Sequence, residues 1–407
     1  MPTTQATAIP VMPAASPGVA CRPYQICSRT VMDTTDPDIS FDSEGISNWW
    51  HDYSDAVTRL GSLEQREQHL KRMISIIKEQ GKGREYDCVL GLSGGTDSSY
   101  MALLAKRFGL RPVVVHFDNG WNSELAVKNI ESIVSKLGFE LQTFVMDWPE
   151  FRDIQRSYFL ASVLDLEVPT DHMIFGALYK IAARHRIQFI LSGNNIWNEF
   201  VLPRAWYYSK FDLANLKGIH QRFGQVKIKK LPALGALART KYLALGITDF
   251  KILNYLPDYK KTSIKAELIA ELGWRDYGGK HYESVFTRFY QGYILPRKWN
   301  IDKRKAHLSN LICSGDMTRE AALQELKNPP YPPLLQDQDK RYVAKKLGFT
   351  EDEFEKILTL PNRDHAEFGT DRRTRAALYR LMALTKPVRR LLGLRPRASK
   401  LAELTHK

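Results

Sequence analysis

The run SGGTDSS at residues 93–99 constrains this chain more than any other feature of its sequence. It follows the apolar segment YDCVLGL (86–92), which predicts a buried strand, and it precedes a helical pattern from about 98 to 108. Glycines allow a tight turn and close backbone approach, and the N–H groups at a helix start attract phosphate oxygens. A strand, a Gly/Ser turn and a helix in this order predict a phosphate site at the edge of an open sheet.

The flanking segments alternate between strands and helices. PVVVHFD (112–118), ELQTFVMD (140–147) and QFILSG (188–193) are expected strands, and 123–137 and 172–186 are expected helices. This alternation predicts an α/β protein with a parallel sheet flanked by helices. No G-x-x-x-x-G-K-[ST] occurs, so the loop is not a Walker A motif and lacks the lysine that reaches the β- and γ-phosphates.

At about 150 residues per domain, 407 residues indicate two or three units. The first 24 residues are rich in Pro, Ala and Thr, which is typical of disorder. A helical pattern covers 54–80, and the chain beyond about 240 is mostly helical and charged. The expected units are a disordered tail (1–24), a short segment plus a helix (25–80), an ATP-binding domain (81–240), a mostly helical substrate or partner region (241–385) and a basic tail (386–407).

The chain carries 59 Lys+Arg against 45 Asp+Glu, a formal charge of +14. Such a charge suits nucleic acid, an anionic membrane surface or phosphorylated small molecules. No basic-aromatic RNA-binding module is visible, which disfavours nucleic acid, and the basic tail is first interpreted as a solvated helix. Without an apolar run of about 20 residues or a secretory signal, a cytoplasmic protein with no membrane span is expected.

The phosphate-binding run resembles the loop of the N-type ATP pyrophosphatases, or PP-loop enzymes, which include NAD synthetase, GMP synthetase and tRNA-thiolating enzymes. In that superfamily ATP is cut between its α- and β-phosphates and the substrate oxygen is adenylated. By this resemblance Asp97 holds Mg²⁺ on the pyrophosphate. The implied ATP-binding residues are Ser93, Gly94, Gly95, Thr96, Asp97, Ser98, Ser99, Asp118, Ser192 and Gly193. The alternative for Asp118 is a purely structural role as a helix or turn cap.

A narrower resemblance covers roughly residues 24–370. The segments YQICSRTVMDTTDPDISFD, VLGLSGGTDSS, VVHFDNGWNSELAVKNI, LSGNNIWNEFVLPRAW and GGKHYESVFTRFYQGYILPRKWNIDKRKAHLSNLI are similar to the N-acetyl sugar amidotransferases, the WbpG/PseA-like enzymes of lipopolysaccharide, O-antigen and flagellar-sugar biosynthesis. The resemblance implies an ATP-dependent ligase that converts an acetamido group of a sugar or nucleotide sugar to an acetamidino group.

Within these segments, Asp97, Glu199 and Asp171 are the candidate catalytic residues, and Glu199 could bind metal or accept a proton from ammonia. The alternative for Glu199 is a charged surface residue without a functional role. Candidate substrate residues are His172, Asn194, Asn195, Trp206, Arg288, Lys303, Arg304 and His307, with similar candidates at His281, Glu283 and Ser284. The basic candidates in this set could equally well form a solvent-exposed face of the protein. Trp274, Tyr277, Phe286 and Phe289 are expected in the core.

The sequence departs from this family at its cysteines. Relatives usually carry two C-x-x-C pairs, which would form a zinc ribbon. Here the first pair reads Cys27 and Thr30, and the second reads Ser47 and Trp50, so we expect a degenerate ribbon without zinc. No cysteine is placed as a glutaminase nucleophile. The resemblance therefore implies ammonia from a separate glutaminase, together with a synthase subunit like that of histidine biosynthesis.

Two other functions stay open at this point. The basic charge is compatible with a tRNA-modifying PP-loop ligase of the lysidine type, which needs no catalytic cysteines. The lost cysteines are compatible with a non-catalytic nucleotide-binding scaffold of a glycan-assembly complex. An intact phosphate-binding run disfavours the scaffold, because a purely structural role does not need it.

Overall fold

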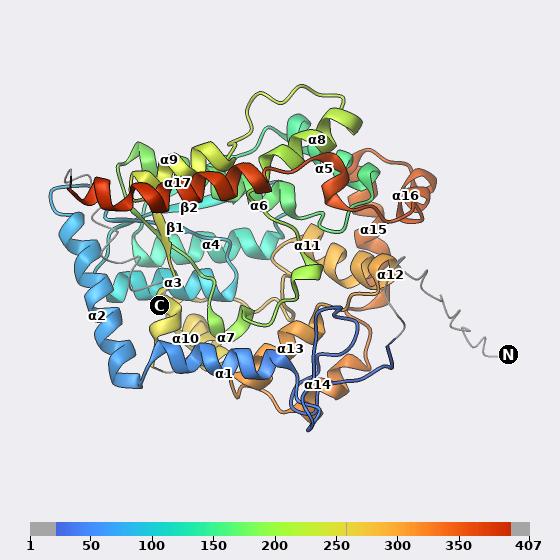
Figure 1. Cartoon of the computed structure of the whole chain (residues 1–407), viewed down its shortest axis with the longest axis horizontal. Helices are drawn as coiled ribbons and strands as arrows, with labels where there is room; N and C mark the ends of the chain where they lie inside the picture. Colours follow the sequence, from blue (N-terminus) through green and yellow to red (C-terminus); the bar gives the residue numbers. More distant parts are fainter. Residues whose placement is uncertain (1–21, 258, 392–407) are drawn as a thin grey trace.

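The protein is built on a parallel five-stranded sheet, and its strands β1 and β2 are labelled in Figure 1. The computed structural model describes residues 22–257 and 259–391, with side chains through residue 385. The strand order is β3-β2-β1-β4-β5, and every neighbouring pair is parallel. The strands are β1 (Cys88–Gly91), β2 (Pro112–Asp118), β3 (Leu141–Val145), β4 (Phe189–Leu191) and β5 (Thr248–Phe250). The predicted α/β class with a parallel sheet is confirmed.

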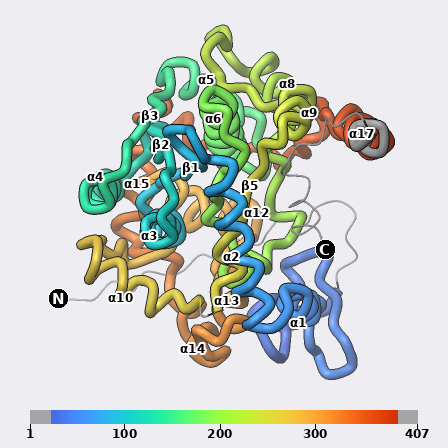
Figure 2. The backbone as a smooth tube through the Cα atoms, turned by 90° about the vertical axis from the view of Figure 1, so that its left-hand side faces the viewer, coloured from blue at the N-terminus to red at the C-terminus, as the bar shows by residue number. Residues whose placement is uncertain are grey.

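Helices cover both faces of this sheet, and Figure 2 shows the two layers. Successive strand side chains point to opposite faces, so Leu90 and Val114 face one layer while Val89 and Val113 face the other. The first layer contains α2 (Leu63–Gln80), α3 (Thr96–Arg107), α4 (Glu124–Leu137) and α10 (Lys261–Leu272); the second contains α6 (Val168–Arg184) and α9 (Ala236–Ala244). Both faces are buried, which explains the near-continuous apolar strands.

A separate aromatic core lies beyond the carboxyl ends of the strands, where Trp121 follows β2, Met146 follows β3 and Val201 follows β4, and it joins segments distant in sequence. Trp121 after β2 packs with Phe286, and Phe159 packs with Phe286 and Phe354. The helices of this core are α5 (Trp148–Ala161), α8 (Leu213–Phe223), α11 (Val285–Phe289), a π-helical turn η3 (Tyr290–Ile294), α12 (Leu295–Trp299), α15 (Pro333–Leu347) and α16 (Glu351–Leu358). The C-terminal region therefore packs directly against the sheet domain.

The remaining elements connect these layers. They are α1 (Asn48–Leu60), α7 (Ile196–Glu199), η1 (Arg204–Trp206), η2 (Ile252–Tyr255), α13 (Arg304–Cys313), α14 (Arg319–Leu326), η4 (His365–Phe368) and α17 (Arg372–Leu391). Within the described residues, no helix combines the length and the apolarity that a membrane crossing requires.

Three details differ from the sequence-based expectations. The helical pattern at 54–80 is two helices, because Gly61 adopts φ 84° and Ser62 starts α2 with a capping box. Strand β5 lies beyond residue 240, where the ATP-binding unit was expected to end, and it pairs with β4. The expected tails fall partly outside the described residues, at 1–21 and 392–407.

The N-terminal segment folds around Cys27, with antiparallel bridges between Ile26 and Asp33 and between Phe41 and Ser47. The Cys27 Sγ accepts the backbone N–H of Thr30 at 3.3 Å and that of Ser47 at 3.2 Å. The segment is fastened to the C-terminal region, since Asp33 pairs with Lys305 and Arg319 donates to the carbonyl of Cys27 at 2.9 Å. One thiol among the four ligand positions does not fit a zinc ion, so packing and hydrogen bonds maintain the shape.

Candidate active site

The predicted phosphate loop (residues 93–99) lies where the strand order reverses. Strands β2 and β3 follow β1 on one side of it, while β4 and β5 lie on the other, so the switch point falls between β1 and β4. Ligands of open α/β sheets bind at this point, outside the carboxyl ends of the strands. Gly193 after β4 approaches the loop so closely that a Cβ atom there would lie 3.3 Å from the Ser98 nitrogen. The structure thus brings the predicted segments 93–99 and 192–193 together.

The phosphate loop is held in one conformation by its own side chains and by the region after α10. Ser98 Oγ accepts the Ser93 N–H at 3.3 Å and donates to the Gly95 carbonyl at 3.1 Å. Gly94 has φ 79°, and its carbonyl accepts the Trp274 indole N–H at 2.8 Å and the Tyr277 hydroxyl at 2.9 Å. A side chain at Gly94 would be strained and would lie 2.9 Å from the carbonyl of Ala126. The loop is therefore a prearranged cradle for phosphate oxygens.

Asp97 is fixed at the start of α3 by two donors. Asn198 Nδ2 donates to Asp97 Oδ1 at 3.2 Å, and the Tyr259 hydroxyl donates to the same oxygen. Asn195 in turn caps α7 by accepting the Asn198 N–H at 3.0 Å. Burial and the neighbouring Asp97 raise the pKa of Tyr259 well above its ordinary value, so it remains a donor. Oδ2 receives no hydrogen bond from the described residues, which leaves it free to bind Mg²⁺.

Two lysines that the sequence analysis did not single out approach Asp97. Lys280 and Lys261 both act electrostatically on Glu199, and Lys280 also interacts with Asp97. Burial and the repulsion of Lys261 lower the pKa of Lys280 to about 8. Among the described residues neither ammonium forms an ion pair with a carboxylate. The signal was present in GGKHYES, where Lys280 directly precedes the histidine that was considered.

Glu199 lies at the end of α7 beside these groups. Burial raises its pKa, and the charge of Asp97 adds to this effect while Lys280 and His281 oppose it. The side chain is nevertheless exposed to solvent. A carboxyl group that water reaches but protein desolvates is typical of a position beside other protein groups, here Asp97 of the phosphate loop, rather than of the open surface.

A second polar cluster surrounds Lys210 near the start of α6. Its ammonium lies 2.7 Å from Asp165 and 3.1 Å from Asp171. Lys303 lies 3.7 Å from Glu167, and Gln291 of the π-helical turn donates to Glu167 at 3.1 Å. Asp165 is buried, whereas the Asp171 side chain is 38% exposed, so only Asp171 of this pair can meet a ligand.

Four predicted substrate residues have structural partners instead. His172 is fully buried; its Nδ1 bonds to the Lys210 carbonyl at 2.8 Å, and its Nε2 accepts the Leu234 N–H at 3.1 Å. Trp206 is 1% exposed and belongs to the aromatic core. Arg288 forms a two-pronged ion pair with Asp339, and Arg304 binds Asp302. We therefore leave these four out of the proposed site.

The other candidates lie after β2, after β4 and on α13. Asp118 follows β2, and its Oδ1 accepts the Gly120 N–H at 2.9 Å, which is the turn cap considered as its alternative. Asn194 is exposed after β4. His307 on α13 lies near Lys280 and Lys303, and its ring centroid is 5.3 Å from that of His281.

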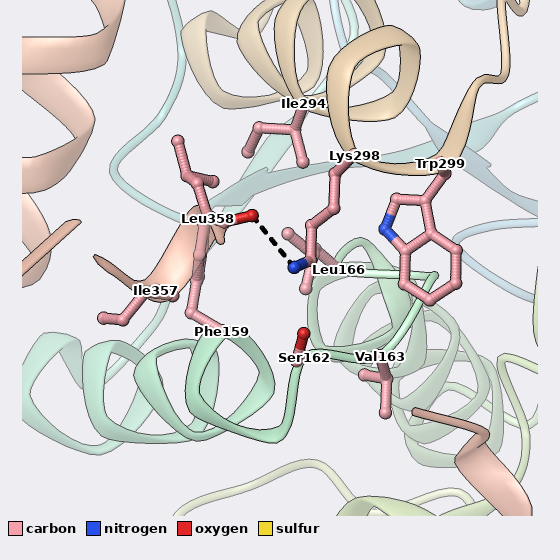
Figure 3. Close-up of a pocket in the computed structure, with 9 residues that line it drawn as sticks. All are labelled: Phe159, Ser162, Val163, Leu166, Ile294, Lys298, Trp299, Ile357 and Leu358. Carbon is pink, nitrogen blue, oxygen red and sulfur yellow. Dashed lines mark hydrogen bonds between the residues drawn. The ribbon is translucent and has the colours of Figure 1, made fainter. Parts of the chain in front are cut away.

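A small apolar cavity elsewhere does not belong to this site (Figure 3). It lies between α5, α12 and α16, and no residue of the phosphate loop lines it. Lys298 points into it and donates to the carbonyls of Leu358 at 3.0 Å and Leu360 at 2.6 Å. Burial lowers the Lys298 pKa to about 8, and its hydrogen bonds explain it as a cap on the end of α16.

Comparison with known proteins gives one family match. Residues 283–384 match the family described as "LPS biosynthesis protein WbpG-like, C-terminal domain". The matched region begins at Glu283, so it includes α11, the π-helical turn and α13.

Two curated relatives and a solved structure are also similar. The uncharacterized protein MJ1599 of Methanocaldococcus jannaschii is 22% identical over 294 residues, 69% of this chain and 86% of its own length. The tRNA(Ile)-lysidine synthase of Chlamydia felis is 26% identical over 179 residues, 43% of this chain and 52% of its own length. An NH3-dependent NAD synthetase from Campylobacter jejuni is 16% identical with a TM-score of 0.30, covering 73% of this chain and 98% of its own.

Taken with the phosphate loop at the switch point, the match over residues 283–384 and the similarity to the lysidine synthase support a member of the PP-loop ATP pyrophosphatase superfamily of WbpG type.

Proposed function

We propose that this WbpG-type member of the PP-loop superfamily is an ATP-dependent sugar amidotransferase. It converts an acetamido group of a sugar or nucleotide sugar to an acetamidino group through an adenylated intermediate, in surface polysaccharide or flagellar glycan biosynthesis. The observation that carries the proposal is the contact between the phosphate loop and the WbpG-like domain. A Cβ atom on Gly95 of the phosphate loop would lie 3.7 Å from Glu283, the first residue of the WbpG-like domain.

The phosphate loop and its neighbours suit the triphosphate of ATP. Thr96, Asp97 and Ser98 form the first turn of α3, where backbone N–H groups lack a helical partner and can bind phosphate oxygens. Lys280 and Lys261 have no carboxylate partner among the described residues, so their charges are available to balance those of the phosphates. Mg²⁺ bound by Asp97, with Glu199 nearby, would neutralise charge on the departing pyrophosphate.

The chemistry explains why an amidotransferase needs ATP. An amide carbon is a poor electrophile, and its oxygen is a poor leaving group. When the amide oxygen attacks the α-phosphate, pyrophosphate leaves and the oxygen becomes part of AMP. Ammonia then forms a C–N bond to the same carbon while the C–O bond to AMP breaks, and one proton is lost from the attacking nitrogen. The enzyme contributes positioning and charge stabilisation.

Polar groups on the C-terminal side suit a polyhydroxylated substrate. Asp171, Glu167 and Lys303 combine acceptors and a donor, and His307 interacts electrostatically with both Lys303 and Lys280. Such a mixed set can bind sugar hydroxyls, and its cations can bind a phosphate or carboxylate of the substrate. The ammonia would come from a separate glutaminase with a synthase subunit like that of histidine biosynthesis.

Mass spectrometry of reaction mixtures tests the proposal. The protein is incubated with Mg-ATP, ammonium and a panel of free and nucleotide-linked acetamido sugars, including UDP-N-acetylglucosamine, and AMP and pyrophosphate are quantified in the same tubes. We expect one sugar to exchange oxygen for NH in step with AMP release. AMP release without a change in any sugar, also with a glutaminase partner present, would contradict the proposal.

A tRNA-modifying ligase is the second candidate, and one observation favours it. The similarity to the tRNA(Ile)-lysidine synthase covers 179 residues, and the chain has a formal charge of +14. Binding of tRNA with a steep salt dependence, together with tRNA-dependent AMP release, would favour this function. The WbpG-like domain at 283–384 favours the sugar instead.

A further inference from the structure

The segment Lys280–Ser284 is fixed by backbone hydrogen bonds to the turn that follows the carboxyl end of β2. Ser284 forms an antiparallel bridge with Asn122, in the turn after β2. The Ser123 N–H donates to the Glu283 carbonyl at 2.9 Å, and the Val285 N–H donates to the Trp121 carbonyl at 3.0 Å. These bonds hold the Glu283 side chain against the phosphate loop and set the position of His281 two residues earlier.

His281 has a backbone conformation that its surroundings must enforce. Its φ is 65°, in the left-handed region. The other described non-glycine residues with positive φ, Ser162, Arg186 and Asn300, all lie at or just beyond helix C-termini, where this conformation is common. His281 ends no helix, and left-handed backbone costs roughly 1 kcal/mol for an ordinary residue. Strain of this kind clusters at functional sites.

The His281 ring lies between a carboxylate and a second histidine. Its Nδ1 is 3.5 Å from Glu283 Oε1, and its ring is tilted by 56° to that of His307. Burial opposes ionisation of Glu283, but the contact with His281 outweighs it and lowers the Glu283 pKa. An ionised carboxylate at Nδ1 holds the proton there, so the lone pair of neutral His281 is on Nε2. This is the arrangement of a base with its orienting acid.

Burial and the surrounding lysines keep His307 neutral. Burial lowers the pKa of His307 well below its ordinary value, and Lys280, Lys303 and Lys261 add to this effect. The groups that face His281 are thus Glu283 from its own segment, Glu199 from α7, and His307 from α13. Glu199 is next to Asp97 and suits metal binding, which leaves the histidine as the group placed to accept a proton.

We propose that His281 is the catalytic base of the ammonia step, with Glu283 as its positioning residue. This inference rests on the proposed amidotransferase function. As the nitrogen of ammonia bonds to the adenylated acetamido carbon, Nε2 of His281 takes one of its protons. The C–O bond then breaks, and AMP leaves with the electron pair. The product is the acetamidino group, and the proton on His281 passes to solvent.

The test separates the two half-reactions for the panel sugar that the wild type converts. Adenylation is followed as sugar-dependent exchange of labelled pyrophosphate into ATP without ammonium, and the ammonia step as amidine formation with ¹⁵N-ammonium. His281→Asn is the main variant, because asparagine tolerates left-handed backbone. Glu283→Gln tests the positioning residue, and Glu199→Gln tests the group proposed to bind metal beside Asp97. His51→Asn on exposed α1 is the matched control.

We expect His281→Asn to retain pyrophosphate exchange within about threefold and to lose ~10²–10⁴-fold in amidine formation. Glu283→Gln should do the same to a smaller degree, again with pyrophosphate exchange retained. With hydroxylamine, a less basic nucleophile, in place of ammonia, the rate of the nucleophile step in His281→Asn should be closer to that of the wild type. Glu199→Gln should instead lower pyrophosphate exchange.

Two results would overturn the assignment. Equal losses in both half-reactions of His281→Asn would assign the residue to ATP binding or folding, and unchanged amidine formation would remove it from the chemistry. Both results require an active wild type. A wild type without sugar-dependent exchange for any panel member would overturn the amidotransferase function itself, and the base assignment with it.

Discussion

Lys210 and Lys280 are both partly buried, and their pKa values move in opposite directions. Two carboxylates, Asp165 at 2.7 Å and Asp171 at 3.1 Å, outweigh burial and raise the pKa of Lys210. At Lys280 burial and Lys261 prevail and lower the pKa to about 8. The comparison separates a cation whose partners are inside the protein from one whose partner must come from outside. The first stabilises the fold, and the second suits an anionic ligand.

The same contrast holds for the aspartates of the two regions. Asp165 accepts the Lys210 ammonium and the Tyr208 N–H at 2.8 Å, while its own N–H donates to His365. It joins three distant segments and has little exposed surface. Asp97 has one oxygen bonded by Asn198 and Tyr259 and the other without a donor among the described residues. Incomplete pairing therefore marks the candidate active site.

The largest expected effect is that of Asp97→Asn. The amide keeps the size of the carboxylate and its bonds to Asn198 and Tyr259 but loses the charge that binds Mg²⁺. AMP and pyrophosphate release should fall by at least ~10³-fold, with little change in the urea unfolding midpoint. Asp52→Asn on the exposed face of α1 is the control. Full function of Asp97→Asn in cells would favour a non-catalytic scaffold.

Next in size is the loss of Asp165. Asp165→Ala leaves Lys210 with only the partly exposed Asp171, and breaking a buried pair costs about 3–5 kcal/mol of unfolding free energy. Urea unfolding followed by tryptophan fluorescence measures this. Asp171→Ala, at 38% side-chain exposure, should cost far less stability. If both variants were equally destabilised, Asp171 would belong to the structural pair alone.

Lys280→Met should weaken ATP binding and leave stability unchanged or raised. Removing the ammonium withdraws one charge from the phosphates, so the KM for ATP should rise ~10–100-fold. Removing an unpaired buried cation also relieves its desolvation penalty. Lys210→Met should have the opposite pattern, with lower stability and an unchanged KM for ATP. Parallel enzyme assays and unfolding curves on the two variants decide between the patterns.

The pH dependence provides a smaller test of the same lysine. Lys280 of the free enzyme loses its charge as the pH rises through about 8, and kcat/KM reports ionisations of the free enzyme. We expect kcat/KM for ATP to fall above pH 8 in the wild type. Lys280→Arg should move this fall to higher pH, because arginine stays protonated. An identical alkaline limb in both proteins would assign it to another group.

The smallest effect is expected in the ribbon. Cys27→Ala removes a sulfur that accepts two buried backbone N–H groups, so unfolding free energy should fall by about 1–3 kcal/mol. Zinc chelators should leave both activity and the unfolding midpoint unchanged, which calorimetry measures. A lower midpoint after chelation would contradict the absence of a zinc site.

Local sequence was most informative where the residues of a single segment determine its structure. The run 93–99 predicted its own strand–turn–helix context, and the apolar segment 112–118 matches β2 residue for residue. Strand β5 was missed because three residues, Thr248–Phe250, hold too little pattern to distinguish them from a loop. Helix α5 was missed as well, although Asp147 and Pro149 resemble a helix start.

For single residues the sequence identified chemical type but not the partner. Arg288 looked like a substrate ligand until Asp339, 51 residues away, proved to be its partner. His172 was a candidate, and its two ring nitrogens turned out to bond distant backbone groups. Lys280, which was passed over, became important because no carboxylate of the described residues forms an ion pair with it. Whether a charge is satisfied depends on contacts that local sequence does not encode.

The sequence by itself thus determined the superfamily loop, the parallel sheet and the lost zinc ligands, because each depends on residues close together in the chain. Only the tertiary structure decided which charged groups are free to act. Free energies of ionisation depend on burial and on neighbours within a few ångströms, and those neighbours come from α3, α7, α10, the 280–284 segment and α13.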